Sequence, residues 1–291
     1  MTIGIPRALF YFCYPDLWES FFHALNLPVF VSPPTAPRTL ERAGLLSESE
    51  HCLPVKLLDA HIDALRDHAD AFFVPRFFSM LPGHVSCTKL RFLPDTARSR
   101  LGPGARVISL DVHEDREPLD RSLCRLARQL GASRAAAQSA SRQALAQCQA
   151  CRSRPPQTPA SVPDYRPILL VSHPYVLHDD FFSGPIVRKL HDLGIPTRLL
   201  DHAAPQLPHD FIGWDTSRRI HHALETLRPA DVSGVIQLSS FNCGCDSMTI
   251  EFFRTLLRQK NVPYMVLMLD EHSAPAGIET RLEAFVDSMR W

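Results

Sequence analysis

Residues 167–201, PILLVSHPYVLHDDFFSGPIVRKLHDLGIPTRLLD, decide the fold of this chain. A continuously apolar run at 168–171 is followed by a polar loop with proline, an amphipathic stretch at 184–194 and a second short apolar run. Apolar runs of this length are typical of buried strands, and the stretch between them has the 3.6-residue periodicity of a helix. The pattern therefore predicts a βαβ unit with parallel strands.

The same succession of segments occurs near the N-terminus. TIGIPRALFYF at 2–12 opens with a predicted strand and leads into a loop with proline, WESFFHAL at 18–25 predicts a helix, and PVFVSPP at 28–34 a second strand. Because strands and helices alternate in both halves, we expect an α/β protein with two Rossmann-like domains, doubly wound and each with a mostly parallel sheet.

The segment between the halves differs in composition. Ala, Gln and Arg dominate residues 119–153, which favours helix, and RPPQTPASVPD at 154–164 has the proline content of a linker. We therefore predict an N-terminal α/β domain at 1–117, a helical Ala-rich connector with its linker at 118–164, and a C-terminal α/β domain at 165–291.

Charge and hydropathy exclude several classes of protein. Lys+Arg and Asp+Glu both number 31 without a dense basic run, which argues against a nucleic-acid or anionic-membrane surface. The longest apolar run, 262–269, is too short to span a bilayer, and the N-terminus lacks the apolar stretch of a signal peptide. With eight cysteines and no such signal, we expect a cytoplasmic protein with reduced thiols. The phosphate-binding patterns G-x-x-x-x-G-K-[ST] and G-x-G-x-x-G are absent, so we do not expect the chain itself to hydrolyse ATP.

Three cysteines stand at three junctions between a loop and a helix: Cys52 in SEHCLPVK, Cys87 in GHVSCTKL and Cys243 in SSFNCGCDS. Loops at the carboxyl ends of parallel strands converge in an open α/β fold, so we expect these thiols to gather. Thiolates are the ligands of a [4Fe–4S] cluster, and three of them leave one iron with an open position. Zinc is the competing metal, but its structural sites show short paired spacings, whereas 34 and 155 residues separate these cysteines. The alternative interpretation of each cysteine is a buried packing residue that binds no metal.

The neighbours of two of these cysteines favour the thiolate form. Pro54 suits the first turn of a helix, so Cys52 would face a helix N-terminus, where the positive dipole end lowers the pKa of a thiol. Lys89 lies two residues beyond Cys87 and would act in the same direction.

The third cysteine, Cys243, follows the predicted strand GVIQLSS. Gly244 permits a tight turn, and Asp246 or Ser247 is expected to cap the next helix. Cys245 is an alternative fourth metal ligand. It would close the iron–sulfur cluster and turn an open catalytic site into an electron-transfer site.

The remaining cysteines carry weaker signals. Cys148 and Cys151 form a lone C-x₂-C, which we interpret as packed or solvated thiols because the second pair that a zinc site needs is missing. Cys13 and Cys124 lie in apolar or amphipathic surroundings and are predicted to be packing residues.

Histidines and acids at strand ends are the candidate catalytic groups. His173 and His272 both follow predicted strands on the side where the cysteines should gather, and Glu271 and Asp270 precede His272. The histidines would donate to a substrate carbonyl or support a metal ligand, and the acids would exchange protons. The alternative is that each histidine hydrogen-bonds only within its own loop. His221 is predicted to lie on a helix surface.

Several longer motifs resemble one family. The motifs are IGIPRAL, YPDLWESFF, VSPPT, EHCLPVK, FVPRF and CTKL in the first half, and SSFNCG, LDEH and ETRLEAF in the second. They are similar to those of short proteins related to the CoA-protein activases and to the iron–sulfur (D-component) subunits of 2-hydroxyacyl-CoA dehydratases. The resemblance covers most of the chain except the Ala-rich middle and the linker. It implies a [4Fe–4S] cluster held by Cys52, Cys87 and Cys243 between Rossmann-like domains.

The resemblance also implies partners. A separate ATP-hydrolysing activase would pass an electron to the cluster, and the catalytic form would be a dehydratase (a lyase) or a reductase acting on a small acyl thioester, with a second dehydratase-like subunit as a further partner. Two positions depart from the family pattern: Thr88 follows Cys87 where proline is expected, and Cys245 replaces a residue that is not a ligand. Two alternatives stay open, a non-catalytic electron-transfer or scaffold subunit and a binding module that holds zinc or no metal.

Overall fold

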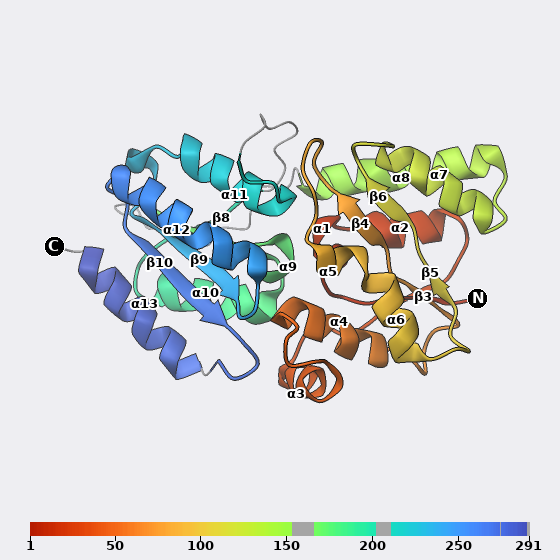
Figure 1. Ribbon diagram of the computed structural model, residues 1–291, viewed down its shortest axis with the longest axis horizontal. Helices are drawn as coiled ribbons and strands as arrows, with labels where there is room; N and C mark the ends of the chain where they lie inside the picture. Colours follow the sequence, from red (N-terminus) through yellow and green to blue (C-terminus); the bar gives the residue numbers. More distant parts are fainter. Residues whose placement is uncertain (153–165, 202–210, 274, 290–291) are drawn as a thin grey trace. The chain divides into compact units, whose positions relative to one another are not determined.

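The computed structural model describes residues 1–152, 166–201, 211–273 and 275–289 (Figure 1). The chain forms two compact units. Unit 1 consists of Met1–Ser49, Val55–Arg154 and Gly213–Asp215, and unit 2 of Glu50–Pro54, Pro155–Ile212 and Thr216–Trp291. Each unit contains a parallel sheet flanked by helices, so the expected α/β fold with Rossmann-like domains is confirmed.

Unit 1 is built on a four-stranded parallel sheet of order β2-β1-β3-β5. A two-stranded parallel sheet, β4-β6, continues from it. The strands are β1 (Ile3–Ile5), β2 (Val29–Val31), β3 (Ala71–Phe73), β4 (Arg76–Ser79), β5 (Val107–Ile108) and β6 (Asp111–His113). The helices are α1 (Phe10–Cys13), α2 (Leu17–Ala24), α3 (Pro37–Leu46), α4 (Leu53–Asp63), α5 (Thr88–Arg91), α6 (Leu93–Leu101), α7 (Leu119–Gln129) and α8 (Arg134–Arg152).

Aromatic side chains form the centre of unit 1. The ring centroids of Trp18 and Phe22 each lie 5.0 Å from that of Phe73 on β3. All three side chains are buried, and burying an aromatic side chain contributes roughly 2–3 kcal/mol. The side chains of Leu57, Leu58, His61 and Ile62 on α4 are buried. Helix α8 packs against both α2 and α7.

Unit 2 is built on a four-stranded parallel sheet of order β10-β9-β7-β8. The strands are β7 (Ile168–Val171), β8 (Thr197–Leu199), β9 (Gly234–Ser240) and β10 (Tyr264–Leu269). The helices are α9 (Pro174–Leu177), α10 (Asp180–Asp192), α11 (Asp215–Thr226), the 3₁₀ turn η1 (Pro229–Asp231), α12 (Gly244–Gln259) and α13 (Pro275–Met289). The βαβ unit predicted at 167–201 is confirmed as β7–α10–β8.

The order of these strands creates a topological switch point. From β7 the chain crosses through α10 to β8 on one side, and from β9 it crosses through α12 to β10 on the other. Because such crossovers are right-handed, α10 and α12 cover opposite faces of the sheet, as Figure 1 shows. In open α/β sheets, ligands bind outside the carboxyl ends of the strands at this kind of point.

Two prolines interrupt the strands of unit 1, and one local prediction was wrong. β1 ends at Ile5, because Pro6 has no backbone N–H and the chain turns into α1. The run AFFVPRF at 71–77 is divided into β3 and β4 around Pro75 for the same reason. His221 is buried rather than on the surface, and its ring stacks on Phe253 with centroids 6.1 Å apart.

Two further sequence predictions concern the middle of the chain and its relation to membranes. The linker predicted at 154–164 lies outside the described residues. Within the described ranges, no helix combines the length and the apolar character needed to cross a membrane.

Candidate functional site

Two predicted site residues of unit 2 meet at the switch point between β7 and β9. His173 follows the end of β7 and precedes α9, while Cys243 follows the end of β9 and precedes α12. Since β7 and β9 are neighbours in the parallel sheet, both residues lie at the same edge. The sequence separates them by 70 positions, and the sheet brings them together.

The turn that presents Cys243 depends on its predecessor. Asn242 has a φ of 60°, the left-handed conformation that Asn tolerates better than most residues. Cys243 then occupies the N-cap position of α12, and its carbonyl accepts a 3.0 Å hydrogen bond from the backbone N–H of Ser247. The prediction of Gly244 as the turn residue and of Asp246 or Ser247 as the cap was therefore wrong, because the chain turns and the helix begins earlier.

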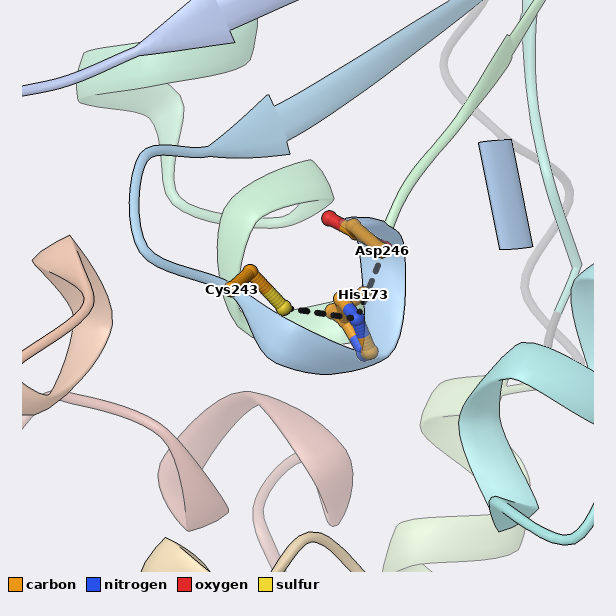
Figure 2. Close-up of side chains that lie close together, drawn as sticks. All are labelled: His173, Cys243 and Asp246. Atoms are coloured by element: carbon orange, nitrogen blue, oxygen red, sulfur yellow. Dashed lines mark hydrogen bonds and ion pairs between the residues drawn. The ribbon is translucent and has the colours of Figure 1, made fainter. Parts of the chain in front are cut away.

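Asp246 joins His173 and Cys243 in what we call the donor triad (Figure 2). Nε2 of His173 lies 3.1 Å from Oδ1 of Asp246 and 3.8 Å from Sγ of Cys243. The ligand atoms of all three side chains lie within 4.8 Å of one another. The residues are 5 %, 9 % and 1 % exposed for His173, Cys243 and Asp246, so the triad is shielded from water.

The sheet holds the Asp246 carboxylate in place. Oγ of Ser239 donates a 2.9 Å hydrogen bond to its Oδ2, and Nε2 of Gln237 donates a 3.4 Å bond to its Oδ1. The hydroxyl of Tyr264 on β10 donates in turn to Oε1 of Gln237. Such a layer of hydrogen bonds restricts the orientation of the carboxylate toward His173.

One ring nitrogen of His173 is left without a partner. The ring stacks on Tyr175, with centroids 5.1 Å apart and planes 6° from parallel. Nδ1 is buried and makes no hydrogen bond with any residue that the structure describes. A buried polar atom without a partner costs free energy, and such atoms are often found at sites of function.

The surroundings of the triad favour charge on both Cys243 and His173. A hydrogen bond from Cys245 is the largest influence that lowers the pKa of Cys243; burial opposes it, and the hydrogen bond and charge of His173 bring the pKa to about 5. Burial lowers the pKa of His173, but the Asp246 carboxylate and the Cys243 thiolate outweigh burial and raise it well above its usual value. Both shifts favour a Cys243 thiolate beside a protonated His173, with the Asp246 carboxylate as counter-ion.

Cys245 and the residues after β10 occupy different positions. Cys245 is buried in the first turn of α12. His272 is exposed in the turn after β10, where its backbone N–H donates to Oδ1 of Asp270, and Glu271 is half-buried in the same turn. Neither His272 nor Glu271 belongs to the donor triad.

The other two predicted ligands lie at helix starts, as the sequence indicates. Cys52 directly precedes α4, in the segment Glu50–Pro54 of unit 2, and is half-buried. Cys87 occupies the N-cap position of α5 in unit 1 and is also half-buried. Asp215 holds the loop before Cys87, because its Oδ2 accepts a 2.5 Å hydrogen bond from Oγ of Ser86.

The remaining cysteines have packing or surface roles. Cys13 and Cys148 are buried, and burial raises the pKa of Cys148. The thiol of Cys124 lies 3.6 Å from the carbonyl oxygen of Ala137, and the thiol of Cys151 donates to Asp16 at 2.8 Å. All eight cysteines lie in the described part of the chain, and no disulfide joins any of them.

Unit 1 also contains a pocket of about 290 Å³ beside α3 and α4. Its polar wall includes Arg42, His61 and Asp63. Arg42 pairs with Asp63 at 2.8 Å, and Nδ1 of His61 lies 2.9 Å from the hydroxyl of Ser32. These polar groups satisfy one another, so they do not indicate a ligand.

Asp246 is the member of the donor triad that sequence reasoning missed. The sequence indicates it only as a helix cap, although it lies three residues beyond Cys243. Residues three apart share a helix face, which is the signal that could have placed Asp246 beside Cys243. Its contact with His173 could not be read from spacing, because it arises from the pairing of β7 with β9.

Comparisons with known proteins support a family but no close relative. Residues 2–202 match the family described as "CoA enzyme activase uncharacterised domain". The matched region includes Cys52, Cys87 and His173 and ends before Cys243. No curated protein matches the chain.

Similar solved structures include the SBP FpvC from Pseudomonas aeruginosa in complex with Mn²⁺, at 14% identity, with 99% of each chain covered and a TM-score of 0.30. The SBP FpvC in complex with Ni²⁺ has 14% identity, covers 99% of this chain and 97% of that chain, and has a TM-score of 0.28. ZnuA has 10% identity, covers 99% and 98%, and has a TM-score of 0.26. Scores this low carry no argument about function.

Proposed function

Because this chain belongs to the family of the CoA enzyme activase uncharacterised domain, we propose that it is an iron–sulfur redox protein of the 2-hydroxyacyl-CoA dehydratase type. In this proposal Cys52, Cys87 and Cys243 hold a [4Fe–4S] cluster. The observation that carries it is the Cys243 thiol, which is held as a thiolate at the start of α12 on the switch-point edge of unit 2.

The chemistry of the three cysteines suits such a cluster. Iron–sulfur clusters bind thiolates, and the pKa of about 5 for Cys243 makes it a thiolate at neutral pH. Cys52 stands directly before the eleven-residue helix α4, where the positive end of the helix dipole favours negative charge. Cys87 stands directly before the single turn α5. Both side chains are half-buried, so they are partly accessible.

His173 and Asp246 support Cys243 in this scheme. When bound, the cluster would supply one-electron transfer and an open iron position for a substrate oxygen. A proton on Nε2 of His173 would lie between the Cys243 thiolate and the Asp246 carboxylate. The thiolate charge is thereby stabilised, and Ser239 keeps the carboxylate oriented.

The partners follow from the same proposal. By the family resemblance, a separate ATP-dependent activase would deliver the electron; the sequence of this chain has neither of the two phosphate-loop patterns. The substrate would be a small acid activated as an acyl thioester, and the reaction a dehydration or a reduction. A second dehydratase-like subunit would complete the enzyme.

A second candidate function is an electron-transfer subunit without its own substrate. Cys245 favours it, because this buried thiol hydrogen-bonds to Cys243 in the first turn of α12. As a fourth ligand it would close the cluster. A spectral change on adding an acyl-thioester analogue indicates the open site, and its absence together with a lost cluster in Cys245→Ala indicates the closed one.

The cluster is tested by metal analysis of protein purified without oxygen. We expect about four irons and about four sulfides per chain in the wild type, lost in Cys52→Ala, Cys87→Ala and Cys243→Ala. Cys124→Ala is the matched control and should keep both. The proposal would be overturned if each of the three single variants kept the iron content of the wild type, or if the wild type contained zinc alone.

A further inference from the structure

The donor triad has a geometry that a proton relay does not explain. In a relay, each ring nitrogen of the histidine has its own partner, one on the nucleophile and one on the carboxylate. Here the same atom, Nε2 of His173, faces both Sγ of Cys243 and Oδ1 of Asp246. Nδ1 makes no hydrogen bond with the described residues. Three donor atoms that converge in this way are typical of side chains around one cation.

The distances between the donor atoms agree with a tetrahedral ion. Zinc binds sulfur at about 2.3 Å and nitrogen or oxygen at about 2.0–2.2 Å, which places two tetrahedral ligands roughly 3.4–3.6 Å apart. The observed separations are 3.8 Å from Sγ to Nε2 and 3.1 Å from Nε2 to Oδ1. The third pair, Sγ of Cys243 and a carboxylate oxygen of Asp246, lies within 4.8 Å. A cation at this point takes the place of the proton that Nε2 shares with its neighbours.

The surroundings also resemble those of a metal site. Ligating carboxylates are commonly oriented by hydrogen bonds from a second layer of residues, and here Ser239 and Gln237 donate to the two oxygens of Asp246. Thiolate, imidazole and carboxylate together suit zinc and its neighbours rather than magnesium or calcium. Three protein ligands leave a fourth position for water or a substrate oxygen.

We infer that His173, Cys243 and Asp246 form a binding site for one divalent transition-metal cation of the zinc class. These three side chains supply the three donor atoms, so the site does not need Cys52 or Cys87. All three residues lie in unit 2. This inference goes beyond the proposed function. Cys243 would be shared between the two, so a cation and an iron–sulfur cluster exclude each other on one chain.

Cobalt titration of the full-length chain tests the site. The starting protein is the metal-free double variant Cys52→Ala/Cys87→Ala, which lacks two of the three proposed cluster ligands. We expect one Co²⁺ per chain with thiolate-to-cobalt absorption, and displacement by Zn²⁺. In the same background, His173→Gln and Asp246→Asn should each weaken Co²⁺ binding at least about tenfold. His191→Gln is the matched control, since His191 is an exposed histidine of unit 2.

Circular dichroism separates lost binding from lost folding. If His173→Gln does not fold, Ser239→Ala replaces it, because this change loosens the carboxylate without removing a ligand. A folded double variant without thiolate-to-cobalt absorption would overturn the inference, as would unchanged binding in folded His173→Gln. The cluster proposal is tested separately on wild-type iron and sulfide, so either idea can fail while the other stands.

Discussion

At the scale of single residues, Asp246 is the side chain on which the donor triad depends most. It is 1 % exposed and contacts His173, Ser239 and Gln237. A buried carboxylate is tolerated only when its partners compensate for lost hydration, and a buried cation such as His173 is equally dependent on it. The triad thus contributes to the stability of unit 2 as well as to its chemistry.

Removing this carboxylate should destabilise the fold. Asp246→Ala leaves the charge of His173 buried without its counter-ion, which costs about 3–5 kcal/mol of unfolding free energy. Urea unfolding of metal-free protein measures the loss. The exposed ion pair of Arg254 with Glu251 provides the control, since Glu251→Ala should cost less than about 1 kcal/mol. Equal losses for the two variants would contradict the prediction.

His61 gives unit 1 a pH dependence of its own. Burial, with the charge of Arg7 adding to it, lowers the pKa of His61 to about 4, and its ring nitrogens face the hydroxyls of Ser32 and Thr35. The unfolded chain therefore binds a proton more readily than the folded one between pH 6.5 and about 4. The contribution of neutral His61 to the free energy of unfolding is fully present above pH 6.5 and is lost as the pH falls toward 4.

Urea unfolding at several pH values measures how steeply the free energy of unfolding depends on pH. Within that window His61 contributes up to about 1.4 kcal/mol of unfolding free energy per pH unit. His61→Gln removes the titrating group. The free energy of unfolding of the wild type should therefore approach that of the variant as the pH falls from 6.5 to 4. A difference that does not change with pH would show that His61 is not buried in its neutral form.

At the scale of elements, the turn between β9 and α12 positions the reactive thiol. Asn242 adopts a φ of 60° immediately before Cys243. For a residue with a Cβ this conformation is about 1 kcal/mol or more higher in free energy than the right-handed one, whereas glycine has no such penalty. The turn therefore aims Cys243 toward His173 through a strained backbone position.

Substitutions at this turn should follow backbone preference. Asn242→Gly and Asn242→Ala both remove the side chain, but the glycine variant should be more stable by about 1 kcal/mol. At Ser247, inside α12, the order should reverse, because alanine is the better helix former. Thermal unfolding of Asn242→Gly, Asn242→Ala, Ser247→Gly and Ser247→Ala tests this. If alanine or glycine gave the higher melting temperature at both positions, a left-handed conformation at Asn242 would be contradicted.

At the scale of the whole molecule, the two units separate the proposed chemistries. The donor triad lies entirely in unit 2, whereas the proposed cluster also uses Cys87 of unit 1. Cation binding should therefore stabilise one unit, and cluster binding should require ligands from both.

Hydrogen exchange can detect this difference. Zinc at a hundredfold excess over its Kd should stabilise unit 2 by about 2.7 kcal/mol, by mass action. In the Cys52→Ala/Cys87→Ala variant, exchange should slow in β9 and α12 and stay unchanged in β1 and β3. Asp246→Asn, which weakens binding at least about tenfold, should reduce this stabilisation by about 1.3 kcal/mol or more at the same zinc concentration. Equal protection of both units would mean that the cation needs residues from each of them.

Local sequence patterns determined the secondary-structure elements and the positions of the cysteines at helix starts. The run at 167–201 predicted β7–α10–β8, and the junctions around Cys52, Cys87 and Cys243 predicted thiols at helix starts. These features depend on the residues within one or two turns of chain, so periodicity and turn chemistry report them directly. The meeting of Cys52, Cys87 and Cys243 remains a prediction.

Tertiary structure alone decided the partner of His173. The histidine meets Asp246 because β7 pairs with β9, while β8 and β10 lie at opposite edges of the sheet. Strand order depends on how whole elements bury their apolar faces against each other, and no local period in the sequence records it. The sequence therefore specified the elements and the cysteine positions, and the order of parallel strands decided which side chains share a site.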